Sequence, residues 1–576
     1  MENSRIATLL KETAQLLELH GANPFQVKHY SSAALCVEKT TQALANLSLG
    51  DLEKLPGLTP SSVKLVNELN TTGTLRRWEE LHQATPNSLR ELFSLRGIGP
   101  KKLRKIWQQL GIDNADDLLK ACEKGEVAAV AGLGQKIQHA IQEGLAFKAQ
   151  YAGMVHYSTA SPYAEELTAR LRQQFPHTLV SLAGPIRRKL EIIGQVDCLV
   201  GTEDIVAVIQ WLDQQPQLQK VKQDSGPFAW RGVFVDSSLK VEIIFCTHQK
   251  FYQQLLLQTG AQAHLRLVVQ EGKSIGERVH ELSAPTSETA IYTHCALPYI
   301  PPELREGRIE LPWALQKGAP TLLEAEDLKG VFHSHTTASD GKHTLAEMAQ
   351  QCKALGYQYL GISDHSQSAA YAGGLRLPAI QQQHREIDIL NQQYADFKIF
   401  KGIESDILTD GSLDYPDAVL ATFDFVIASV HSGLQMDQAK ATQRLIRAIE
   451  NPYTTMLGHL TGRLLLRREG YPIDYRAVID ACAAHGVIIE INANPWRLEL
   501  DWRWLDYALS KKVWISINPD AHNREGLKHM YYGVCVGRKG GLTAAQTFNA
   551  LPLRGVEQYL AERKRRVTNR LEVAKG

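Results

Sequence analysis

The stretch Gly330-Val331-Phe332-His333-Ser334-His335 shows the pattern that decides the fold of the C-terminal part of this 576-residue chain. A short apolar run leads directly into two histidines that lie one residue apart. Side chains alternate along a strand with a period of two, so both imidazoles are expected on one face. Six further apolar segments follow between residues 359 and 517, and each also leads into a histidine or a carboxylate. Their spacing is that of a repeating strand–helix unit.

Such a repeat predicts parallel strands arranged in a barrel, with the functional site at the carboxyl ends of the strands. We therefore expect the polar residues that follow the segments to meet at one mouth of the barrel. Nine side chains are candidate metal ligands: His333, His335, Asp340, His365, Glu404, His431, His459, Asp520 and His522. Asp364, Glu490 and Asn492 are not candidate ligands themselves and are expected to orient histidines from outside the donor set.

The types of these nine side chains indicate a particular chemistry. Nitrogen and carboxylate donors without thiolates favour Zn²⁺, Mn²⁺ or Fe²⁺ over Mg²⁺ or Ca²⁺ alone. A single histidine of this kind would more often be an ordinary core or surface residue, but a full set at successive strand ends is hard to explain by coincidence. Clustered divalent ions lower the pKa of bound water and stabilise charge on phosphate oxygens. The barrel is therefore predicted to hydrolyse a phosphoester.

Bulk properties limit the class of protein. The length exceeds what one hydrophobic core can support, so several domains are expected. The net charge of +1 gives no global attraction to nucleic acid, so any such surface must be local. The 8 cysteines are scattered without CxxC pairs, which favours reduced thiols. With no signal-peptide pattern and no apolar run of bilayer length, we expect a cytoplasmic protein without a membrane partner.

A glycine motif occurs three times in residues 1–145, a part whose pattern is almost wholly helical. Its copies are Leu55-Pro56-Gly57-Leu58-Thr59, Leu95-Arg96-Gly97-Ile98-Gly99 and Val130-Ala131-Gly132-Leu133-Gly134. Each copy lies between two predicted helices, so its backbone N–H groups should lie at the N-terminus of the second helix, where an anion binds readily. Lysines just downstream would add attraction to a nucleic-acid backbone.

The alternative interpretation is that these glycines simply end ordinary helices. Three copies with a shared core favour binding to the DNA backbone instead. The predicted DNA-binding residues are Gly57, Gly97, Gly99, Lys101, Lys102, Gly132, Gly134 and Lys136.

The middle of the chain contains Gly184-Pro185-Ile186-Arg187-Arg188, followed by Gly194-Gln195-Val196-Asp197. This segment resembles the signature of family X DNA polymerases, and the three glycine motifs resemble helix-hairpin-helix motifs. Together with the barrel, the whole chain resembles a bacterial family X DNA polymerase with a C-terminal polymerase-and-histidinol-phosphatase (PHP) domain. The resemblance covers nearly all residues and includes the order of the domains.

The resemblance implies a multidomain α and α/β fold. Residues 1–148 would form a helical helix-hairpin-helix DNA-binding (8-kDa-like and fingers) domain, and 149–312 a nucleotidyltransferase-like α+β palm with thumb. Residues 313–328 would be a linker, and 329–576 a distorted (β/α)7 PHP barrel. In the barrel the resemblance implies up to three ions, Zn²⁺ or Mn²⁺, with Glu404 as a bridging ligand.

The palm departs from the family pattern at its catalytic carboxylates. Gln195 stands where the family has its first aspartate, Asp197 is kept, and Glu242 takes the third position. The polymerase reaction needs carboxylates that bridge two Mg²⁺ ions beside a triphosphate. A neutral amide cannot bridge two cations as an anion does, and the glutamate reaches one methylene further. Asp197 and Glu242 are therefore the residual catalytic candidates, with Mg²⁺ as a candidate ion.

The nucleotide pocket departs from the pattern as well. Pro185 replaces a serine that would bind phosphate, the family's Tyr-Phe-Thr-Gly-Ser shelf reads as residues 257–261 here, and Leu265 replaces an asparagine. Gly184, Arg187 and Arg188 are retained and remain candidates for holding the phosphates of a dNTP. The family's lyase lysine is also missing, because its position is Leu65. We expect template-directed synthesis to be weak or absent.

The joint prediction is a DNA repair enzyme whose PHP barrel acts on duplex, gapped or recessed DNA. The resemblance implies 3′→5′ exonuclease activity, with AP-endonuclease or 3′-phosphatase activity as further candidates. One alternative is an active DNA polymerase with an exonuclease that fills gaps in base-excision repair. Another is a non-catalytic DNA-binding scaffold or a small-molecule phosphatase. A monomer is expected.

Overall fold

The computed structural model describes residues 1–40, 42–55, 57–95, 98–316 and 319–573. It divides into two compact units, Met1–Ala152 and Gly153–Gly576. Within the described residues, no helix is both long enough and apolar enough to cross a membrane. The finer division at residues 312 and 328 stays a prediction.

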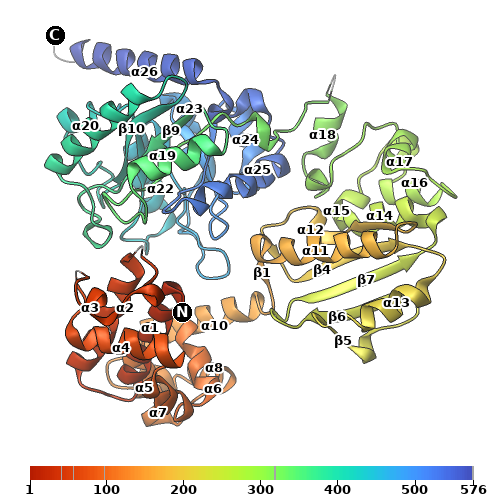
Figure 1. The fold of residues 1–576 in the computed structure, drawn as a ribbon. Helices are drawn as coiled ribbons and strands as arrows, with labels where there is room; N and C mark the ends of the chain where they lie inside the picture. Colours follow the sequence, from red (N-terminus) through yellow and green to blue (C-terminus); the bar gives the residue numbers. More distant parts are fainter. Residues whose placement is uncertain (41, 56, 96–97, 317–318, 574–576) are drawn as a thin grey trace. The chain divides into compact units, whose positions relative to one another are not determined.

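The first unit is helical, and no strand occurs among its described residues. Its α-helices are α1 (Asn3–Leu19), α2 (Pro24–Lys39), α3 (Leu49–Leu52), α4 (Pro60–Thr72), α5 (Arg76–Gln83), α6 (Asn87–Glu91), α7 (Pro100–Leu110), α8 (Ala115–Glu123), α9 (Glu126–Ala129) and α10 (Gly134–Gln150). One hydrophobic cluster is built from residues 6–75. A second combines Leu19 with residues 89–145. The predicted helical front is confirmed (Figure 1).

The second unit begins with a five-stranded mixed sheet, in the spatial order β2-β4-β7-β6-β5. The strands are β2 (Leu179–Leu182), β4 (Gln195–Gly201), β5 (Leu218–Lys220), β6 (Ala229–Phe234) and β7 (Lys240–Cys246). The central pair, β4 and β7, is parallel, and the other neighbours are antiparallel. Helices α11 (Tyr157–Gln174) and α13 (Ile205–Asp213) share a hydrophobic cluster with this sheet. Strand-like runs of the sequence at residues 178–182, 197–200 and 241–245 correspond to β2, β4 and β7.

A group of helices follows this sheet, and its members share a separate hydrophobic cluster. They are α14 (Phe251–Thr259), α15 (Gln262–Leu265), α16 (Ile275–His280), α17 (Glu288–His294) and α18 (Glu310–Leu315). Buried residues of α14, α16, α17 and α18 form the cluster. This helical group has the place in the chain that the resemblance gives to the thumb.

The C-terminal part is a parallel seven-stranded sheet in the order β14-β13-β12-β11-β10-β9-β8. The strands are β8 (Gly330–Val331), β9 (Tyr359–Ile362), β10 (Lys398–Asp406), β11 (Phe425–Ser429), β12 (Met456–Leu457), β13 (Ile488–Asn492) and β14 (Ile515–Asn518). Beyond the ends of β8 and β14, Ser334 forms a parallel bridge with Ala521. The backbone N–H of His335 donates to the Ala521 carbonyl at 2.8 Å, so the barrel is nearly closed. The predicted seven-stranded barrel is confirmed.

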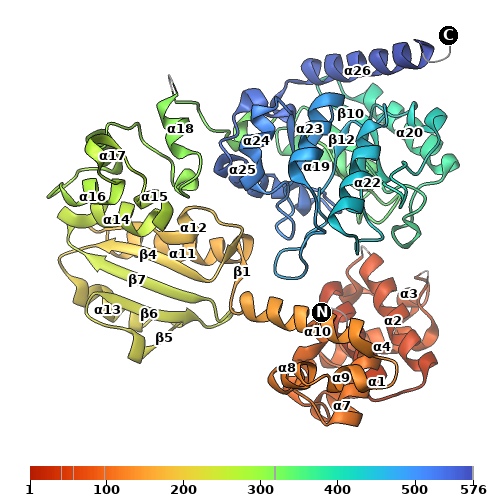
Figure 2. The same cartoon turned by 180° about the vertical axis from the view of Figure 1, so that it is seen from behind.

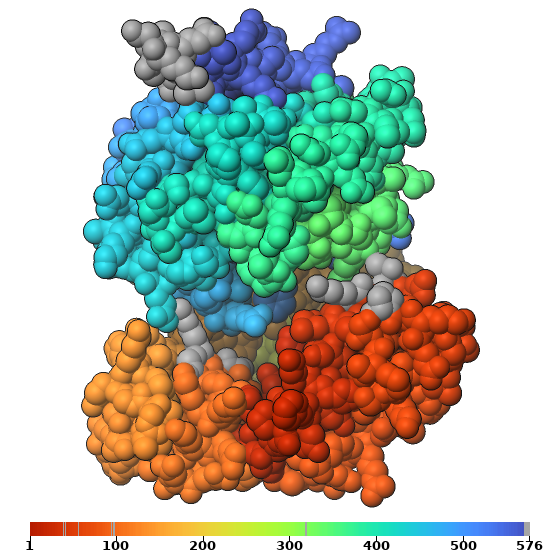
Figure 3. Space-filling view, turned by 90° about the vertical axis from the view of Figure 1, so that its left-hand side faces the viewer, coloured from red at the N-terminus to blue at the C-terminus, as the bar shows by residue number. Residues whose placement is uncertain are grey.

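Helices surround these strands in both ribbon views (Figures 1 and 2). They are α19 (Leu345–Ala354), α20 (Leu377–Gln393), α21 (Asp417–Leu420), α22 (Gln438–Glu450), α23 (Tyr475–His485), α24 (Leu505–Ser510) and α25 (Met530–Lys539). The last helix, α26 (Leu553–Val573), lies on the outside of the barrel (Figure 3). Its Val556 and Leu560 pack in a cluster with Phe332 and Phe400 from the strands.

Two strands extend further than the sequence indicates. Glu404 lies inside β10, whereas the apolar pattern placed it after the strand. Glu490 and Asn492 likewise lie inside β13. The reason is that their neighbours continue the ladder, because Glu404 pairs with Ile427 and Glu490 with Ser516. Polar side chains therefore point into the barrel from within strands as well as from the loops that follow.

Candidate metal centre and DNA-binding elements

The nine predicted ligands meet at the carboxyl ends of the barrel strands. Among the described residues they form four overlapping groups, in each of which the potential donor atoms lie within 4.8 Å of one another. The groups are His335–Asp340–His365–His522, His333–Glu404–His459, His333–His335–Asp520 and His365–Glu404–His431. Each of the nine residues belongs to at least one group. Side chains from strands far apart in the sequence thus converge on one small volume.

Glu404 is the centre of this arrangement. Its Oε1 lies 2.9 Å from His459 Nε2, 3.1 Å from His333 Nε2 and 3.2 Å from His431 Nε2. Its Oε2 lies 2.9 Å from His365 Nδ1. Four imidazoles around one buried carboxylate place it where a ligand that bridges several cations would lie.

Several buried polar atoms in the cluster make no hydrogen bond of acceptable angle among the described residues, although His333 Nε2 and His365 Nδ1 lie close to Glu404. They are His333 Nε2, His335 Nδ1, His365 Nδ1, His459 Nδ1 and Glu404 Oε2. Leaving a buried polar atom unpaired costs about 1–3 kcal/mol, so proteins rarely gather such atoms without a ligand. Imidazole and carboxylate donors suit Zn²⁺ or Mn²⁺, so the residues present fit divalent ions. The cluster suggests a metal site but does not identify the metal.

The charges of the cluster keep its carboxylates ionised. Burial alone would raise the pKa of Glu404, but the positive charges of His431, His333 and His365 hold it well below its usual range. The pKa of Asp520 is held low in the same way, against its burial, by His333 and other imidazoles. The same carboxylates raise the pKa of His333 and His431, against the effect of burial, so a bound cation would have to displace protons from these imidazoles.

Two carboxylates fix the orientation of histidines by binding the Nδ1 atom, on the side of the ring away from Glu404. Glu490 Oε2 accepts the Nδ1–H of His333 at 2.6 Å. Asp406 accepts from His431 Nδ1 in the same manner. Holding Nδ1 leaves each Nε2 facing Glu404, which is how an outer partner sets the tautomer of a metal-binding histidine. The sequence analysis missed Asp406, although its position two residues after Glu404 on β10 gave a period-two signal for the same face.

The other two expected orienting residues act differently from the prediction. Asp364 accepts from the backbone N–H of Thr336 at 2.8 Å and from its hydroxyl at 2.7 Å, so it anchors the loop that carries Asp340. Asn492 donates to Asp520 Oδ2 at 3.1 Å. These two residues orient a loop and a carboxylate instead of histidines, a correction that depends on contacts between distant segments.

The palm carboxylates are adjacent but already have partners. Asp197 and Glu242 are paired in register on β4 and β7. Gln195 Nε2 donates to Asp197 Oδ1 at 2.7 Å and to Glu242 Oε2 at 3.1 Å. Arg231, opposite Glu242 on β6, donates from Nε to its Oε1 at 2.5 Å. An amide and a guanidinium therefore lie against the carboxylates that would hold ions. Burial raises the pKa of Asp197 to about 6, and the Gln195 amide opposes that shift.

The retained signature arginines take part in ion pairs. Arg187 Nη2 lies 2.6 Å from Glu288 Oε2. Arg188 Nε lies 3.0 Å from Glu306 Oε1, an oxygen that Lys539 Nζ also approaches, to 2.6 Å. Each guanidinium thus has an acidic partner that a second cation shares, Arg305 at Glu288 and Lys539 at Glu306. Gly184 has a φ of +57°, and a Cβ there would lie 2.0 Å from Asp197 Oδ2, so only glycine fits beside that carboxylate.

The glycine motifs form turns before helices, as expected. Gly57 (φ +88°) precedes α4, and Gly132 (φ +81°) precedes α10, so both adopt a left-handed backbone that favours glycine. Gly99 is the N-cap of α7, and Gly134 is the first residue of α10. Gly97 lies outside the described residues.

The lysines near these turns differ in their surroundings. Lys136 is exposed in the first turn of α10. Lys101 is exposed at the start of α7, with its Nζ 3.5 Å from Glu18 Oε1, and Lys102 beside it is half-buried. Lys105, which the sequence analysis did not single out, donates to the Ala131 carbonyl at 2.8 Å. It links α7 to the third motif, a contact that only the tertiary structure reveals.

Three family models match separate parts of the chain. A helix-hairpin-helix domain model matches residues 1–75, and a SAM-like helix-hairpin-helix tandem model matches residues 89–146. A PHP domain model matches residues 332–494. The chain is 34% identical over 571 residues to the DNA polymerase/3′-5′ exonuclease PolX of Bacillus subtilis (strain 168), a match that covers 97% of this chain and 99% of that protein. This chain belongs to the PolX family.

Other relatives share a smaller part of the PolX-family chain. A probable phosphatase of Thermoanaerobacter sp. (strain X514) is 27% identical over 248 residues, which is 41% of this chain and 95% of that protein. A probable phosphatase of Caldicellulosiruptor saccharolyticus is 33% identical over 203 residues, 33% of this chain and 78% of that protein. Metal-dependent phosphoester chemistry is thus the chemistry of the PHP domain that this PolX-family chain carries.

Proposed function

We propose that this PolX-family chain processes DNA ends in base-excision repair. Its PHP barrel acts as a 3′→5′ exonuclease, with AP-endonuclease or 3′-phosphatase action as further activities of the same site. Its palm carries out little or no template-directed synthesis. The observation that carries the proposal is the convergence of nine ligand-type side chains on one barrel mouth, with four imidazoles around Glu404.

The residues of the barrel support hydrolysis by holding the donor atoms in place. Bound divalent ions supply water activation and charge neutralisation on phosphate oxygens at such a site. Glu490 and Asp406 keep the Nε2 atoms of His333 and His431 directed at Glu404. Asn492 holds Asp520 through a hydrogen bond of 3.1 Å. The site is thus fixed before any substrate arrives, which lowers the cost of organising it during the reaction.

The first unit supports DNA as the substrate. Its turns place backbone N–H groups at the N-termini of α4, α7 and α10, where phosphate oxygens bind without regard to base sequence. Lys101 and Lys136 add positive charge at the starts of two of these helices. Duplex, gapped or recessed DNA is therefore the proposed partner.

The palm supports the second half of the proposal. Gln195 and Arg231 donate hydrogen bonds to the carboxylates of Asp197 and Glu242. Binding of two Mg²⁺ ions there would require these contacts to break, and the site would still have one negative charge fewer than three carboxylates provide. The signature arginines would likewise have to leave Glu288 and Glu306 to hold a triphosphate.

Two other functions have specific support. The printed name of the Bacillus subtilis relative includes polymerase as well as exonuclease, and the adjacency of Asp197 and Glu242 favours retained synthesis. The relatives named probable phosphatases favour a small-molecule substrate for the barrel. A small-molecule phosphatase does not explain why the chain carries helix-hairpin-helix domains.

A primer with a labelled 5′ end, annealed to a longer template, separates these functions. With Mn²⁺ alone we expect the primer to shorten from its 3′ end, and added dNTPs should not lengthen it at a comparable rate. Extension at an ordinary rate would establish the polymerase alternative. An unchanged primer, together with release of phosphate from small monoesters, would establish the phosphatase alternative.

The matched variants are His335→Ala and His485→Ala. His335 belongs to two of the donor groups, whereas His485 is the last residue of α23, outside every group. We expect His335→Ala to abolish shortening while duplex binding persists, and His485→Ala to shorten the primer as the wild type does. Digestion by His335→Ala at the wild-type rate would overturn the assignment of the site.

A further inference from the structure

An exposed aromatic ring lies beside the candidate metal centre. Tyr371 belongs to a short turn, Ala370–Ala372, in the segment between β9 and α20. Its side chain is 69% exposed, and its ring centroid lies 6.4 Å from that of His365, one of the nine predicted ligands. Singly exposed apolar side chains are common on protein surfaces, so the informative feature of this ring is its position beside the candidate metal centre.

The segment that carries Tyr371 is tied to the site and well packed. The N–H of Leu375 donates to the His365 carbonyl at 2.8 Å. The hydroxyl of Tyr415 donates to the Leu375 carbonyl. The neighbours Ala369 and Ala372 are 0% and 3% exposed. Ala369 and Ala372 are buried and Ala370 is exposed, so the turn is anchored on both sides of Tyr371 while the ring faces outward. A partner that stacks on the ring therefore has little additional backbone to order.

The ring of Tyr371 is an uncharged phenol at physiological pH, because the ordinary pKa of a tyrosine hydroxyl is about 10. Its faces can therefore stack on a nucleobase without a charge penalty.

A guanidinium with unused donor capacity also lies at the site. Arg497 Nε lies 3.5 Å from Asp520 Oδ2, and its Nη1 lies 4.0 Å from Glu499 Oε1. Nη1 is buried and makes no hydrogen bond within the described parts of the chain. A phosphate oxygen is the natural acceptor for such a donor. Asp520 and His365 both belong to the donor groups of the candidate metal centre, so Arg497 and Tyr371 each lie beside a residue of the same site.

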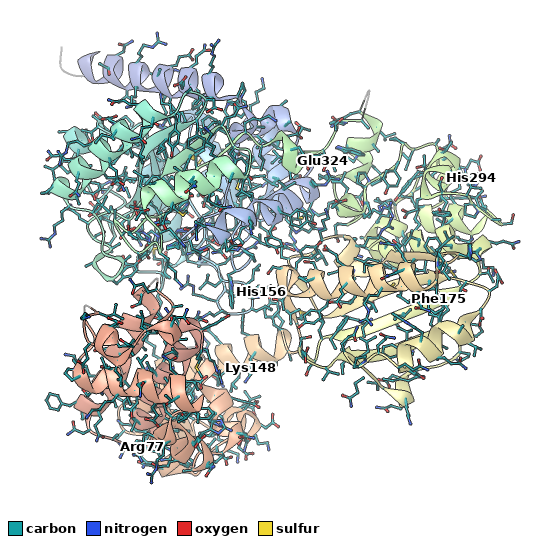
Figure 4. All side chains as sticks on the ribbon, viewed as in Figure 1. Arg77, Lys148, His156, Phe175, His294 and Glu324 are labelled. Atoms are coloured by element: carbon teal, nitrogen blue, oxygen red, sulfur yellow. The ribbon has the colours of Figure 1, made fainter. Side chains whose placement is uncertain are left out.

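A second exposed aromatic ring, next to Arg497 in the chain, is less available. Trp496 is 50% exposed, but its ring lies 4.3 Å from that of His156, which is labelled in Figure 4. One side of Trp496 is thus already occupied by a protein side chain. Tyr371 is the ring better placed to receive a partner from solvent.

We propose that Tyr371 stacks on the base of the 3′-terminal nucleotide while Arg497 holds a phosphate oxygen of the same strand end. Tyr371 would thus be the residue that makes the barrel prefer nucleotide ends to phosphoesters without a base. This inference rests on the proposed 3′→5′ exonuclease function and adds the recognition of the terminal nucleotide to it.

The test compares two labelled oligonucleotides that present the same phosphodiester. One ends in a normal 3′-nucleotide, and the other in a tetrahydrofuran that lacks the base. Stacking on one aromatic ring corresponds to about 10- to 100-fold in binding. We expect Tyr371→Ala to lower kcat/KM by that factor on the normal end, mainly through KM, and to leave the baseless end unchanged. Tyr371→Phe, which keeps the ring, should behave as the wild type.

Leu377→Ala is the matched control, because Leu377 is also an exposed apolar residue, at the start of α20. The assays use saturating Mn²⁺, and the metal content of each variant is measured. These two controls exclude the possibility that the variants and the wild type differ in how much metal they bind. Equal losses on both ends, or no loss on either, would overturn the inference while the exonuclease function stands. Failure of the wild type to digest either end would instead refute the proposed function, and the inference would fall with it.

Discussion

At the residue scale, the candidate centre depends on pairs of imidazole and carboxylate groups in which each member has a separate task. Glu404 faces the histidines from the front, whereas Glu490 and Asp406 hold two of them from behind. Glu490 is itself held, because Asn518 Nδ2 donates to its Oε2 at 2.8 Å. The positions of the candidate ligands thus also depend on surrounding residues that would not contact a metal ion themselves.

Glu490→Gln tests that layer. The amide has one acceptor oxygen instead of two, so it cannot keep both the His333 Nδ1–H and the backbone N–H of His459, which Glu490 Oε1 accepts at 3.0 Å. Loss of an orienting partner typically weakens metal binding about 10- to 100-fold. We expect that loss in a calorimetric titration with Zn²⁺ or Mn²⁺.

The control for this variant is Glu347→Gln. Glu347 completes the capping box of α19 with Thr344, and it belongs to none of the donor groups. Its substitution should cost a little stability and leave metal affinity unchanged. Equal affinity of Glu490→Gln and wild type, at similar melting temperatures, would show that Glu490 has no orienting role.

At the scale of elements, the proposed DNA contact of the first unit lies in the turns that precede the helices and not along the helices themselves. Gly57 and Gly132 have a left-handed backbone in the turns that precede α4 and α10. Lys136 is exposed in the first turn of α10. We propose that this turn, the N-terminus of α10 and Lys136 together bind one phosphate of DNA.

Lys136→Gln tests this element on α10. Removing one phosphate contact should weaken duplex binding for all sequences alike and reduce the slope of log affinity against log salt by about 1. Fluorescence anisotropy of a labelled duplex at several salt concentrations measures both quantities. Lys120→Gln on α8 is the control, because Lys120 is exposed but pairs with Asp117 at 3.2 Å, away from the turns. An unchanged slope for Lys136→Gln would exclude the third motif from the DNA contact.

At the scale of the whole molecule, the chain consists of two compact units with separate hydrophobic clusters. The first carries the predicted DNA-binding turns and the second the nine ligand-type residues. Catalysis on DNA would then depend on their covalent connection, because binding by one unit raises the local concentration of DNA at the other.

Expression of residues 1–152 and 153–576 as separate proteins tests this dependence. Each should melt cooperatively, since each contains its own core. The first should bind duplex DNA without digesting it. The second should digest DNA ends with kcat/KM lowered about 100-fold, mainly through KM, because the local enrichment of DNA is lost. Full activity of residues 153–576 alone would show that the first unit does not deliver the substrate.

The sequence alone was sufficient to predict the elements and the residue types of the candidate site. Apolar segments that end in ligand-type side chains are local patterns, and the parallel repeat brings strand ends together whatever the detailed packing. The seven strands were therefore predicted correctly, and all nine predicted ligands lie in the donor groups. The departures from the family pattern at Gln195 and Glu242 could also be recognised from the sequence, because the family's motif can be compared with this chain position by position.

Only the tertiary structure decided what surrounds those residues. Arg231 meets Glu242 through the register of β6 against β7, and Asp364 meets Thr336 across two loops. The exposure of Tyr371 depends on how its turn packs, with Ala369 and Ala372 buried and Ala370 exposed. Such contacts join residues that are distant in the chain, and no local periodicity encodes them. The local strand pattern of the sequence predicted which side chains could bind metal. Their hydrogen-bond partners depend on which strands and loops become neighbours in the folded chain.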